Sequence, residues 1–304
     1  MAKTITLIES TRPDHRRLAA AVVQSLLPET GKAIRLGISG VPGVGKSTFI
    51  EVLGLHLIEQ GHKLAVLAVD PSSQRTGGSI MGDKTRMEQL SQRLEAFIRP
   101  SPTSGALGGV AAQTREAMLL CEAAGYDVII IETVGVGQSE TMVAGMVDCF
   151  ALLQLPNAGD DLQAIKKGIM EIADLIAINK ADINPNATQL AIAQFRSGLH
   201  LLQPSAPGWT TPVIPCSGLK NEGIREFWQQ VKKFQHLLAD SGELQNRRQR
   251  QAVDWFWSII DNGLRQLLER NREQKQRLRA AVESVATGAS SPVSAAHALL
   301  DQLS

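Results

Sequence analysis

The chain has 304 residues, of which 43% are hydrophobic and 20% charged, and its formal net charge of +1 predicts neither nucleic acid nor a membrane surface as a partner. The three cysteines (Cys121, Cys149 and Cys216) are scattered, which argues against a disulfide framework or a zinc site. No signal peptide and no apolar run of about 18 residues is recognisable, so we predict a cytoplasmic protein without a spanning helix.

The predicted helices and strands alternate along most of the chain. In chain order they are helix 16–27, strand 34–38, helix 46–60, strand 64–69, a short helix near 84–94, helix 111–124, strand 128–131, strand 149–155, helix 161–172, strand 175–178, helix 188–202, strand 213–216 and helix 222–238. The strand segments are rich in Val, Ile and Leu, which is typical of parallel strands buried on both faces. Residues 71–109 otherwise show little periodicity, and a long Gly-containing segment of this kind is often functional. The alternation predicts an α/β fold with a doubly wound, mostly parallel sheet.

We predict three regions, namely an N-terminal helical extension at 1–30, a central α/β domain at 31–240 and a helical C-terminal arm at 241–304. The arm shows no strand pattern and contains the aromatic run Trp255, Phe256 and Trp257. These side chains either pack on the central domain or form an interface between two copies of the chain. The sequence leaves both interpretations open, and the oligomeric state would separate them.

The segment from Gly40 to Ser47 matches the pattern G-x-x-x-x-G-K-[ST] and lies between a predicted strand and a predicted helix. In this context the backbone amides of the loop and the helix N-terminus bind phosphate oxygens. Lys46 is predicted to bridge the β- and γ-phosphates as a catalytic residue, and the Ser47 hydroxyl to bind Mg²⁺. The nucleotide-binding residues predicted here are Gly40, Val41, Pro42, Gly43, Val44, Gly45, Lys46, Ser47 and Thr48.

Asn179, Lys180 and Asp182 form an N-K-x-D pattern directly after the predicted strand 175–178. The carboxyl end of a strand is where ligands bind in open α/β sheets. The Asp182 carboxylate would accept hydrogen bonds from the N1–H and amino groups of guanine, whereas adenine would leave it unpaired. Asn179 would connect this loop to the phosphate loop, and the Lys180 stem would cover the base. A backbone amide for the guanine O6 would come from Ser217, Gly218 and Leu219. The sequence thus predicts GTP or GDP as the ligand.

Glu132 follows the predicted strand 128–131, at a position from which an acidic residue binds Mg²⁺ directly or through water. The backbone amide of Gly135 would then sense the γ-phosphate. Val136 stands where Ras-like enzymes have a glutamine that orients the attacking water, and we do not assume that Gln138 replaces it. We therefore predict that intrinsic hydrolysis is slow or depends on groups from elsewhere.

Two further acidic residues are candidates for binding Mg²⁺ or for positioning water. Asp70 follows the predicted strand 64–69, and Asp83 lies in a Gly-Asp-Lys-Thr-Arg segment. Each also has a structural interpretation, because Asp70 fits the start of an Asp-Pro turn and Asp83 fits a helix cap. The sequence leaves these alternatives open.

Four segments together resemble the MeaB/ArgK/MMAA-type GTPases, which accompany adenosylcobalamin-dependent methylmalonyl-CoA mutase. The segments are VDPSS (69–73), GGSIMGDKTRM (77–87), ETVGVGQSE (132–140) and DDLQAIKKG (160–168). The resemblance covers about residues 5–240 and continues weakly through 255–257. The chain departs from the family at Gln74, where Pro is usual, and in its Ala/Ser-rich end; we also expect most of the family's extra N-terminal helix to be missing.

The resemblance implies a SIMIBI-class P-loop fold whose helical extensions form a homodimer. It implies a cobalamin-dependent acyl-CoA mutase as the partner, with a GTP cycle that gates cofactor delivery and protects the mutase from inactivation. It also implies that Asp70, Asp83 and Glu132 surround Mg²⁺ and the hydrolytic water. The segment 156–167, which includes Lys166, would be a loop that responds to the partner.

Three alternatives have less support. A nickel-inserting GTPase of related architecture would need a His- or Cys-rich metal-storage stretch, whereas the six histidines are dispersed. A transport-linked protein kinase, the activity described for some family members, would need a catalytic loop for an acceptor hydroxyl, and none is recognisable. A purely structural protein would have no use for Lys46, Ser47 and Asp182 together.

Overall fold

The computed structural model describes residues 1–10, 12–69, 87–100, 107–133, 139–156, 167–268 and 272–301. The chain forms two compact units, Met1–Gln251 and Ala252–Ser304. Helix α11 (Glu243–Leu268) begins in the first unit and ends in the second. The predicted boundary after residue 240 lies just before α11, whereas the compact units divide within that helix. Among the described helices, none combines the length and the apolar character needed to cross a bilayer.

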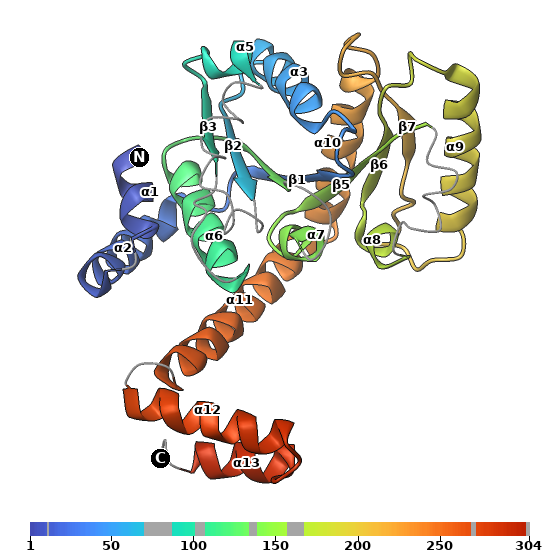
Figure 1. Cartoon of the computed structure of the whole chain (residues 1–304). Coiled ribbons are helices and arrows are strands. Elements are labelled where there is room, and N and C mark those ends of the chain that lie inside the picture. Colours follow the sequence, from blue (N-terminus) through green and yellow to red (C-terminus); the bar gives the residue numbers. More distant parts are fainter. Residues whose placement is uncertain are drawn as a thin grey trace. The chain divides into compact units, whose positions relative to one another are not determined.

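A seven-stranded sheet forms the centre of the first unit, and all its paired strands are parallel (Figure 1). The strands are β1 (Ile34–Gly40), β2 (Leu64–Val69), β3 (Ala96–Pro100), β4 (Val128–Thr133), β5 (Cys149–Gln154), β6 (Leu175–Ile178) and β7 (Val213–Pro215). Their order is β3-β2-β4-β1-β5-β6-β7, which confirms the predicted α/β class. Because β1 lies between β4 and β5, the loop that follows β1 opens at the point where the strand order reverses, and ligands bind there in such sheets.

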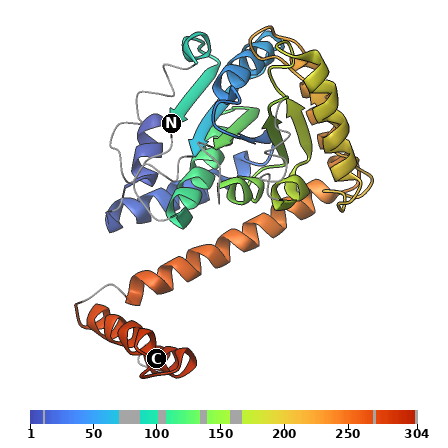
Figure 2. The ribbon, with the colours of Figure 1, turned by 45° about the vertical axis from the view of Figure 1, so that its right-hand side comes forward.

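Helices cover both faces of this sheet (Figure 2). Before α11, the described helices of the first unit are α1 (Ala2–Ile8), α2 (Pro13–Leu26), the 3₁₀ turn η1 (Leu27–Glu29), α3 (Lys46–Glu59), α5 (Glu88–Ser91), α6 (Leu107–Ala123), α7 (Ser139–Ala144), α8 (Lys167–Ile172), α9 (Pro185–Leu199) and α10 (Ile224–Asp240). In β4, Val128 and Ile130 join the core of one face, while Ile129 and Ile131 join the core of the other. This alternation explains the continuous apolar run, since a strand buried on both faces has no polar side to present.

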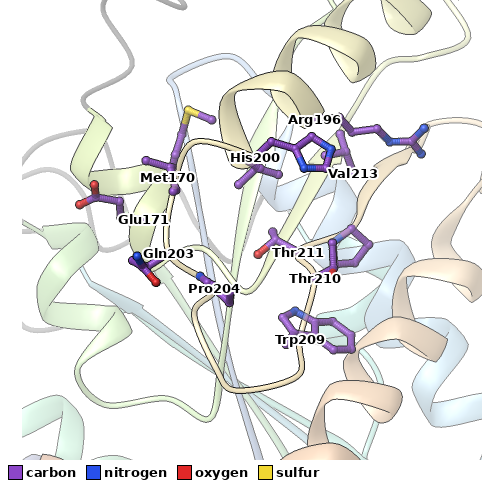
Figure 3. Close-up of a pocket in the computed structure, with 13 residues that line it drawn as sticks. Met170, Glu171, Arg196, His200, Gln203, Pro204, Trp209, Thr210, Thr211 and Val213 are labelled. Atoms are coloured by element: carbon purple, nitrogen blue, oxygen red, sulfur yellow. The ribbon is translucent and has the colours of Figure 1, made fainter.

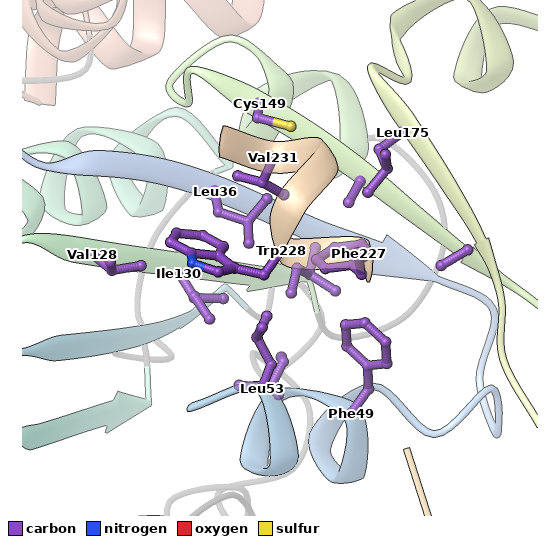
Figure 4. Packing of buried hydrophobic residues seen from close by; sticks show 14 of the residues in the cluster. Leu36, Phe49, Leu53, Val128, Ile130, Cys149, Leu175, Phe227, Trp228 and Val231 are labelled. Atoms are coloured by element: carbon purple, nitrogen blue, oxygen red, sulfur yellow. The ribbon is translucent and has the colours of Figure 1, made fainter. Parts of the chain in front are cut away.

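The core on the side of α3 and α10 supports the loop after β1. Phe49 of α3 and Phe227 of α10 are both fully buried and meet edge to face, with ring centroids 4.9 Å apart (Figure 4). Trp228, also buried, packs in the same cluster with Leu36 of β1 and Leu53 of α3. The first turn of α3 is therefore fixed by aromatic packing directly below the predicted phosphate loop.

Strand β3 and helices α1 and α7 are present in the structure although the sequence analysis did not predict them. Strand β3 lies at the edge of the sheet and falls in the segment read as having little periodicity. It is short, and the almost fully exposed Leu94 just before it obscures the pattern. Helix α7 spans only six residues, too few to show a helical period. Helix α9 begins at Pro185, ahead of the predicted start, because the Asn184 side chain caps it by accepting a hydrogen bond from the Ala187 amide at 3.0 Å.

The start of α11 is bound to the amino edge of the sheet by two buried ion pairs. Arg248 donates to both carboxylate oxygens of Asp148, at 2.7 and 2.6 Å, and to the Ala33 carbonyl at 2.8 Å. Arg247 donates to Asp174 at 3.1 and 3.3 Å. Asp148 and Asp174 immediately precede β5 and β6, so these two arginines hold α11 against the ends of two central strands.

The second unit consists of the rest of α11 with α12 (Arg272–Ala286) and α13 (Pro292–Leu300). Helices α12 and α13 lie side by side, and the Ser284 and Ser290 hydroxyls at the turn between them are 2.8 Å apart. The Ala/Ser-rich end of the sequence, which belongs to the predicted helical arm, forms α13 and part of α12. In α11, large apolar side chains are exposed, namely Val253, Phe256, Trp257, Ile259, Ile260 and Leu264.

Candidate nucleotide-binding site

The predicted phosphate loop connects the end of β1 at Gly40 to the start of α3 at Lys46. A Cβ atom on Gly40 would lie 2.4 Å from the Leu153 carbonyl oxygen of β5, so only glycine fits there. Gly45 has φ +92°, and a Cβ atom on it would lie 3.0 Å from the Asn179 side-chain nitrogen. Glycines therefore let the loop approach β5 and the residue after β6, and turn back into the helix.

Lys46 and Ser47 begin α3, where the unpaired amides of the first turn give a positive potential. The Lys46 ammonium donates to the Gly40 carbonyl at 2.6 Å and lies 3.4 Å from the Val41 carbonyl oxygen. The side chain thus folds back over its own loop. Ser47 is half-buried and the neighbouring Thr48 is exposed. This end of the helix presents amides, an ammonium group and a hydroxyl in one place, which suits a polyphosphate.

Asn179, 2% exposed, links three loops at the carboxyl edge of the sheet. Its side-chain amide donates to the Val44 carbonyl of the phosphate loop at 2.8 Å, and its side-chain oxygen accepts from the Gly218 amide at 3.0 Å. Its backbone amide donates to the Gln154 carbonyl at the end of β5, at 2.7 Å. These hydrogen bonds therefore fix the positions of the loop after β6 and the turn after β7 relative to the phosphate loop.

Lys180 adopts a left-handed backbone conformation, with φ +62°, which is uncommon for a residue other than glycine. Its ammonium group donates to the Gly43 carbonyl at 2.8 Å, so the side chain reaches from this loop to the phosphate loop. Asp182 is half-buried two residues later. The fold thus brings together the two predicted nucleotide-binding loops, which are separated by more than a hundred residues in the sequence.

The turn after β7 is closed by two hydrogen bonds between the backbones of Ser217 and Glu222, at 2.9 and 3.0 Å. Within it the Gly218 amide is bound to Asn179, and the Lys220 amide donates to the Ser217 hydroxyl at 3.1 Å. Within the described ranges, the Leu219 amide has no acceptor, and the Leu219 side chain is exposed. Cys216 precedes the turn, and burial raises the pKa of its thiol to about 12.

Glu132 is 2% exposed near the end of β4. It pairs in register with Ile38 of β1 and with Ala68 of β2, so it lies between the strand that leads to the phosphate loop and the strand that leads to Asp70. The next residue, Thr133, places its hydroxyl 2.8 Å from the Ser39 hydroxyl of β1. The sequence analysis did not identify Ser39 and Thr133, although hydroxyl side chains at the carboxyl ends of adjacent strands are a usable signal.

Four predicted site residues lie outside the described residues. They are Asp70, Asp83, Gly135 and Lys166.

Comparisons with known proteins show to which family the chain belongs. The family model described as "Methylmalonyl Co-A mutase-associated GTPase MeaB" matches residues 1–273. GTPase ArgK of Escherichia coli (strain K12) is 54% identical over 258 residues, which cover 84% of this chain and 78% of ArgK. The mitochondrial methylmalonic aciduria type A homolog of Mus musculus is 47% identical over 311 residues, covering 99% of this chain and 75% of that protein.

A solved structure is also similar over nearly the whole chain. It is the crystal structure of a protein described as LAO/AO transport system kinase, and it matches with a TM-score of 0.79 and 40% sequence identity, covering 99% of this chain and 92% of that one. The family match, the identities and the arrangement of the two loops agree with one another. The chain belongs to the MeaB family of methylmalonyl-CoA mutase-associated GTPases, and it is a P-loop GTPase.

Proposed function

We propose that this GTPase serves an adenosylcobalamin-dependent methylmalonyl-CoA mutase, gating the loading of cobalamin and protecting the mutase from inactivation. The description of the matching family names this mutase, and the name of the mouse relative refers to methylmalonic aciduria. The observation that carries the proposal is family membership over residues 1–273. It is supported by the Asn179 side chain, which connects the phosphate loop to the turn after β7 through hydrogen bonds with Val44 and Gly218.

Guanine selection rests on two groups in this proposal. The Asp182 carboxylate accepts hydrogen bonds from the N1–H and amino groups of the base. The Leu219 amide, without an acceptor among the described residues, donates to the guanine O6. Asn179 positions the loop with Asp182 and the turn with Leu219, because its side chain is bound to the phosphate loop and to the Gly218 amide. An adenine base would leave the carboxylate unpaired, and this is the basis of the discrimination.

Phosphate binding rests on Lys46 and on the amides around it. When a triphosphate binds, the Lys46 ammonium exchanges its hydrogen bonds with the Gly40 and Val41 carbonyls for phosphate oxygens. The Ser47 hydroxyl at the start of α3 and the Glu132 carboxylate near the end of β4 are hard oxygen donors, and this donor type fits Mg²⁺. We assign Asp70 and Asp83 to the same ion and its water. The bound ion would neutralise charge on the phosphate oxygens.

Partner and assembly complete the proposal. The segment 156–167, with Lys166, responds to the mutase, and the arm from residue 241 onward forms a homodimer in the cytoplasm. Val136, in place of a water-orienting glutamine, makes intrinsic hydrolysis slow, so the mutase has room to accelerate it.

The experiment mixes the purified protein with purified methylmalonyl-CoA mutase and follows phosphate release from GTP. We expect faster release on mixing and slower loss of mutase activity during turnover. Lys46→Ala is the control, because it should abolish both effects while the protein still folds. If phosphate release and mutase lifetime both stay unchanged on mixing, the mutase assignment is wrong.

The similar solved structure, whose description is that of a transport system kinase, favours one second candidate, a protein kinase. A kinase transfers the γ-phosphoryl group to a protein hydroxyl instead of to water. With γ-labelled GTP, the proposed GTPase cycle places the label in inorganic phosphate. Stable label on a protein, lost in Lys46→Ala, would instead support the kinase.

A further inference from the structure

A cavity of about 510 Å³ lies away from the nucleotide site, between α8, the end of α9 and the segment that leads into β7 (Figure 3). Asn179 follows the carboxyl end of β6, whereas Val213, which lines this cavity, is the first residue of β7. In a parallel sheet these positions are on opposite edges. The cavity is therefore a separate site, and its volume is within the usual range for small-molecule pockets.

The walls of this cavity are fixed by hydrogen bonds from the segment that leads into β7. The Trp209 indole donates to the Asp174 carbonyl at 2.8 Å, and the Thr211 hydroxyl donates to the Ala173 carbonyl at 3.2 Å. Arg247 donates to the Ser205 carbonyl at 3.2 Å. The same segment is thus bound at three points to the rest of the first unit. The cavity is preformed, so a ligand need not order it.

The residues that line the cavity provide an apolar surface and two basic side chains. Met170, Trp209 and Val213 are 8%, 5% and 3% exposed and supply the apolar surface. Arg196 and His200 are exposed, four residues apart at the end of α9, and lie next to each other in Figure 3. Within the described part of the chain, neither side chain forms a hydrogen bond or an ion pair. An arginine at the rim of an apolar cavity, with no carboxylate partner among the described residues, is suited to an anionic ligand.

We propose that this cavity binds a small organic acid with one carboxylate and an apolar body. The planar Arg196 guanidinium presents two parallel donors to a carboxylate, and His200 adds a third donor from the same helix face. Glu171 also lines the cavity, so a singly charged head group is favoured over a dianionic phosphate. The apolar body of the ligand covers Met170, Trp209 and Val213. This goes beyond the proposed function, since neither GTP nor the mutase enters the argument.

The test is calorimetric titration of the GDP-loaded protein with hexanoate as the probe. We expect hexanoate to bind, while acetate (the same head group without the body) and hexylamine (the same body with the opposite charge) bind at least about tenfold more weakly. Arg196→Gln should weaken hexanoate at least about tenfold and leave hexanol unaffected, because only the charged contact is removed. Arg225→Gln is the matched control, since Arg225 is an exposed arginine on α10 that does not line the cavity.

GTP hydrolysis by Arg196→Gln should equal that of the unchanged protein, which shows that the variant folds and that the nucleotide site is intact. Equal hexanoate affinity in Arg196→Gln and in the unchanged protein would overturn the proposal, as would hexylamine binding as tightly as hexanoate. Hexyl phosphate binding more tightly than hexanoate would overturn the carboxylate assignment.

Discussion

Asp182 is the residue whose chemistry separates guanine from every other base in the proposed site. Asp182→Asn replaces an acceptor by a donor at one of the two base contacts. We expect GTP affinity to fall by about 10²-fold or more and xanthosine triphosphate to become the better ligand, because xanthine offers an acceptor where guanine offers an amino group. Equilibrium binding with fluorescent nucleotide analogues measures both.

The matched control for this substitution is Asp240→Asn, which makes the same change at an exposed position at the end of α10. It should leave both nucleotide affinities as they are. Unchanged GTP binding in Asp182→Asn would show that the base is read elsewhere.

The buried thiols make stability depend on pH above neutrality. Burial raises the pKa of Cys121 and of Cys216 from 9.0 to about 12, with a smaller contribution from Glu122 and Glu226 respectively. The unfolded chain releases each proton near 9.0, while the folded chain retains it until about 12. The stability contribution is therefore complete below pH 9 and is lost as pH rises from about 9 towards about 12.

Cys216→Ala removes one of these groups. In urea unfolding, we expect the loss of stability between about pH 9 and about pH 10 to be smaller in this variant by about 1 kcal/mol than in the unchanged protein. Below pH 8 the difference between the two proteins should be constant. Parallel stability curves across the alkaline range would contradict the assignment.

At the residue scale, motifs predict which side chains would contact a nucleotide, but they do not predict the hydrogen bonds that hold those side chains in place. The phosphate loop, Asn179 and Asp182 follow from motifs, because phosphate and guanine chemistry require those side chains at those spacings. The sequence does not reveal that the Gly218 amide is already bound to Asn179, whereas the Leu219 amide has no acceptor among the described residues. That distinction depends on a turn geometry which several sequences can adopt.

At the scale of elements, the attachment of α11 to the sheet depends on ion pairs whose side chains are largely buried. The Asp148 side chain is 1% exposed and that of Arg248 11%. Arg248→Met leaves the carboxylate buried without its cation, and we expect the free energy of unfolding to fall by about 3–5 kcal/mol. Chemical denaturation followed by circular dichroism measures this change.

Arg250→Met is the matched control, because the pair between Arg250 and Glu243 lies on the same helix but Arg250 is 61% exposed. Removing an exposed pair should cost at most about 1 kcal/mol. If both substitutions cost the same, the buried pair does not hold the helix.

The elements that were predicted correctly share one property. β2 and β6 were predicted with the bounds that the structure shows, since strands buried on both faces are nearly uninterrupted apolar runs. β3 was missed because its apolar and polar residues form no clear pattern, and α7 because it is too short to show a period. Residues 96–100 form a strand because they pair with β2 in the sheet, and not because of their composition. A single sequence does not show which segments will pair in this way.

At the scale of the whole molecule, the strand order determines where the site forms. Strands β2, β3 and β4 lie on one side of β1, with β4 next to β1. Strands β5, β6 and β7 lie on the other side. The residues at the carboxyl ends of β1, β4, β6 and β7 are therefore adjacent, although they are spread over most of the chain. Parallel strands with right-handed crossovers make this juxtaposition a consequence of topology.

The second unit raises the question of assembly, which concerns the molecule as a whole. Val253, Phe256, Trp257, Ile260 and Leu264 are all exposed, and their spacing of three, four and seven residues places them on one stripe of α11. Phe256 and Trp257 are 55% and 58% exposed, and their rings lie 5.5 Å apart. A continuous apolar stripe of this kind is the surface through which we expect the proposed dimer to form.

We therefore expect Trp257→Asp to dissociate the proposed dimer, because the substitution places a charge at the centre of the stripe, where a second copy would bury it. Sedimentation velocity in GDP and in a GTP analogue should show a dimer for the unchanged protein and a monomer for the variant. Ser258→Asp adds the same charge off the stripe and should remain dimeric. GTP binding per chain should be equal in all three proteins, since the nucleotide loops lie within Met1–Gln251. A monomeric unchanged protein would mean that the stripe has another partner.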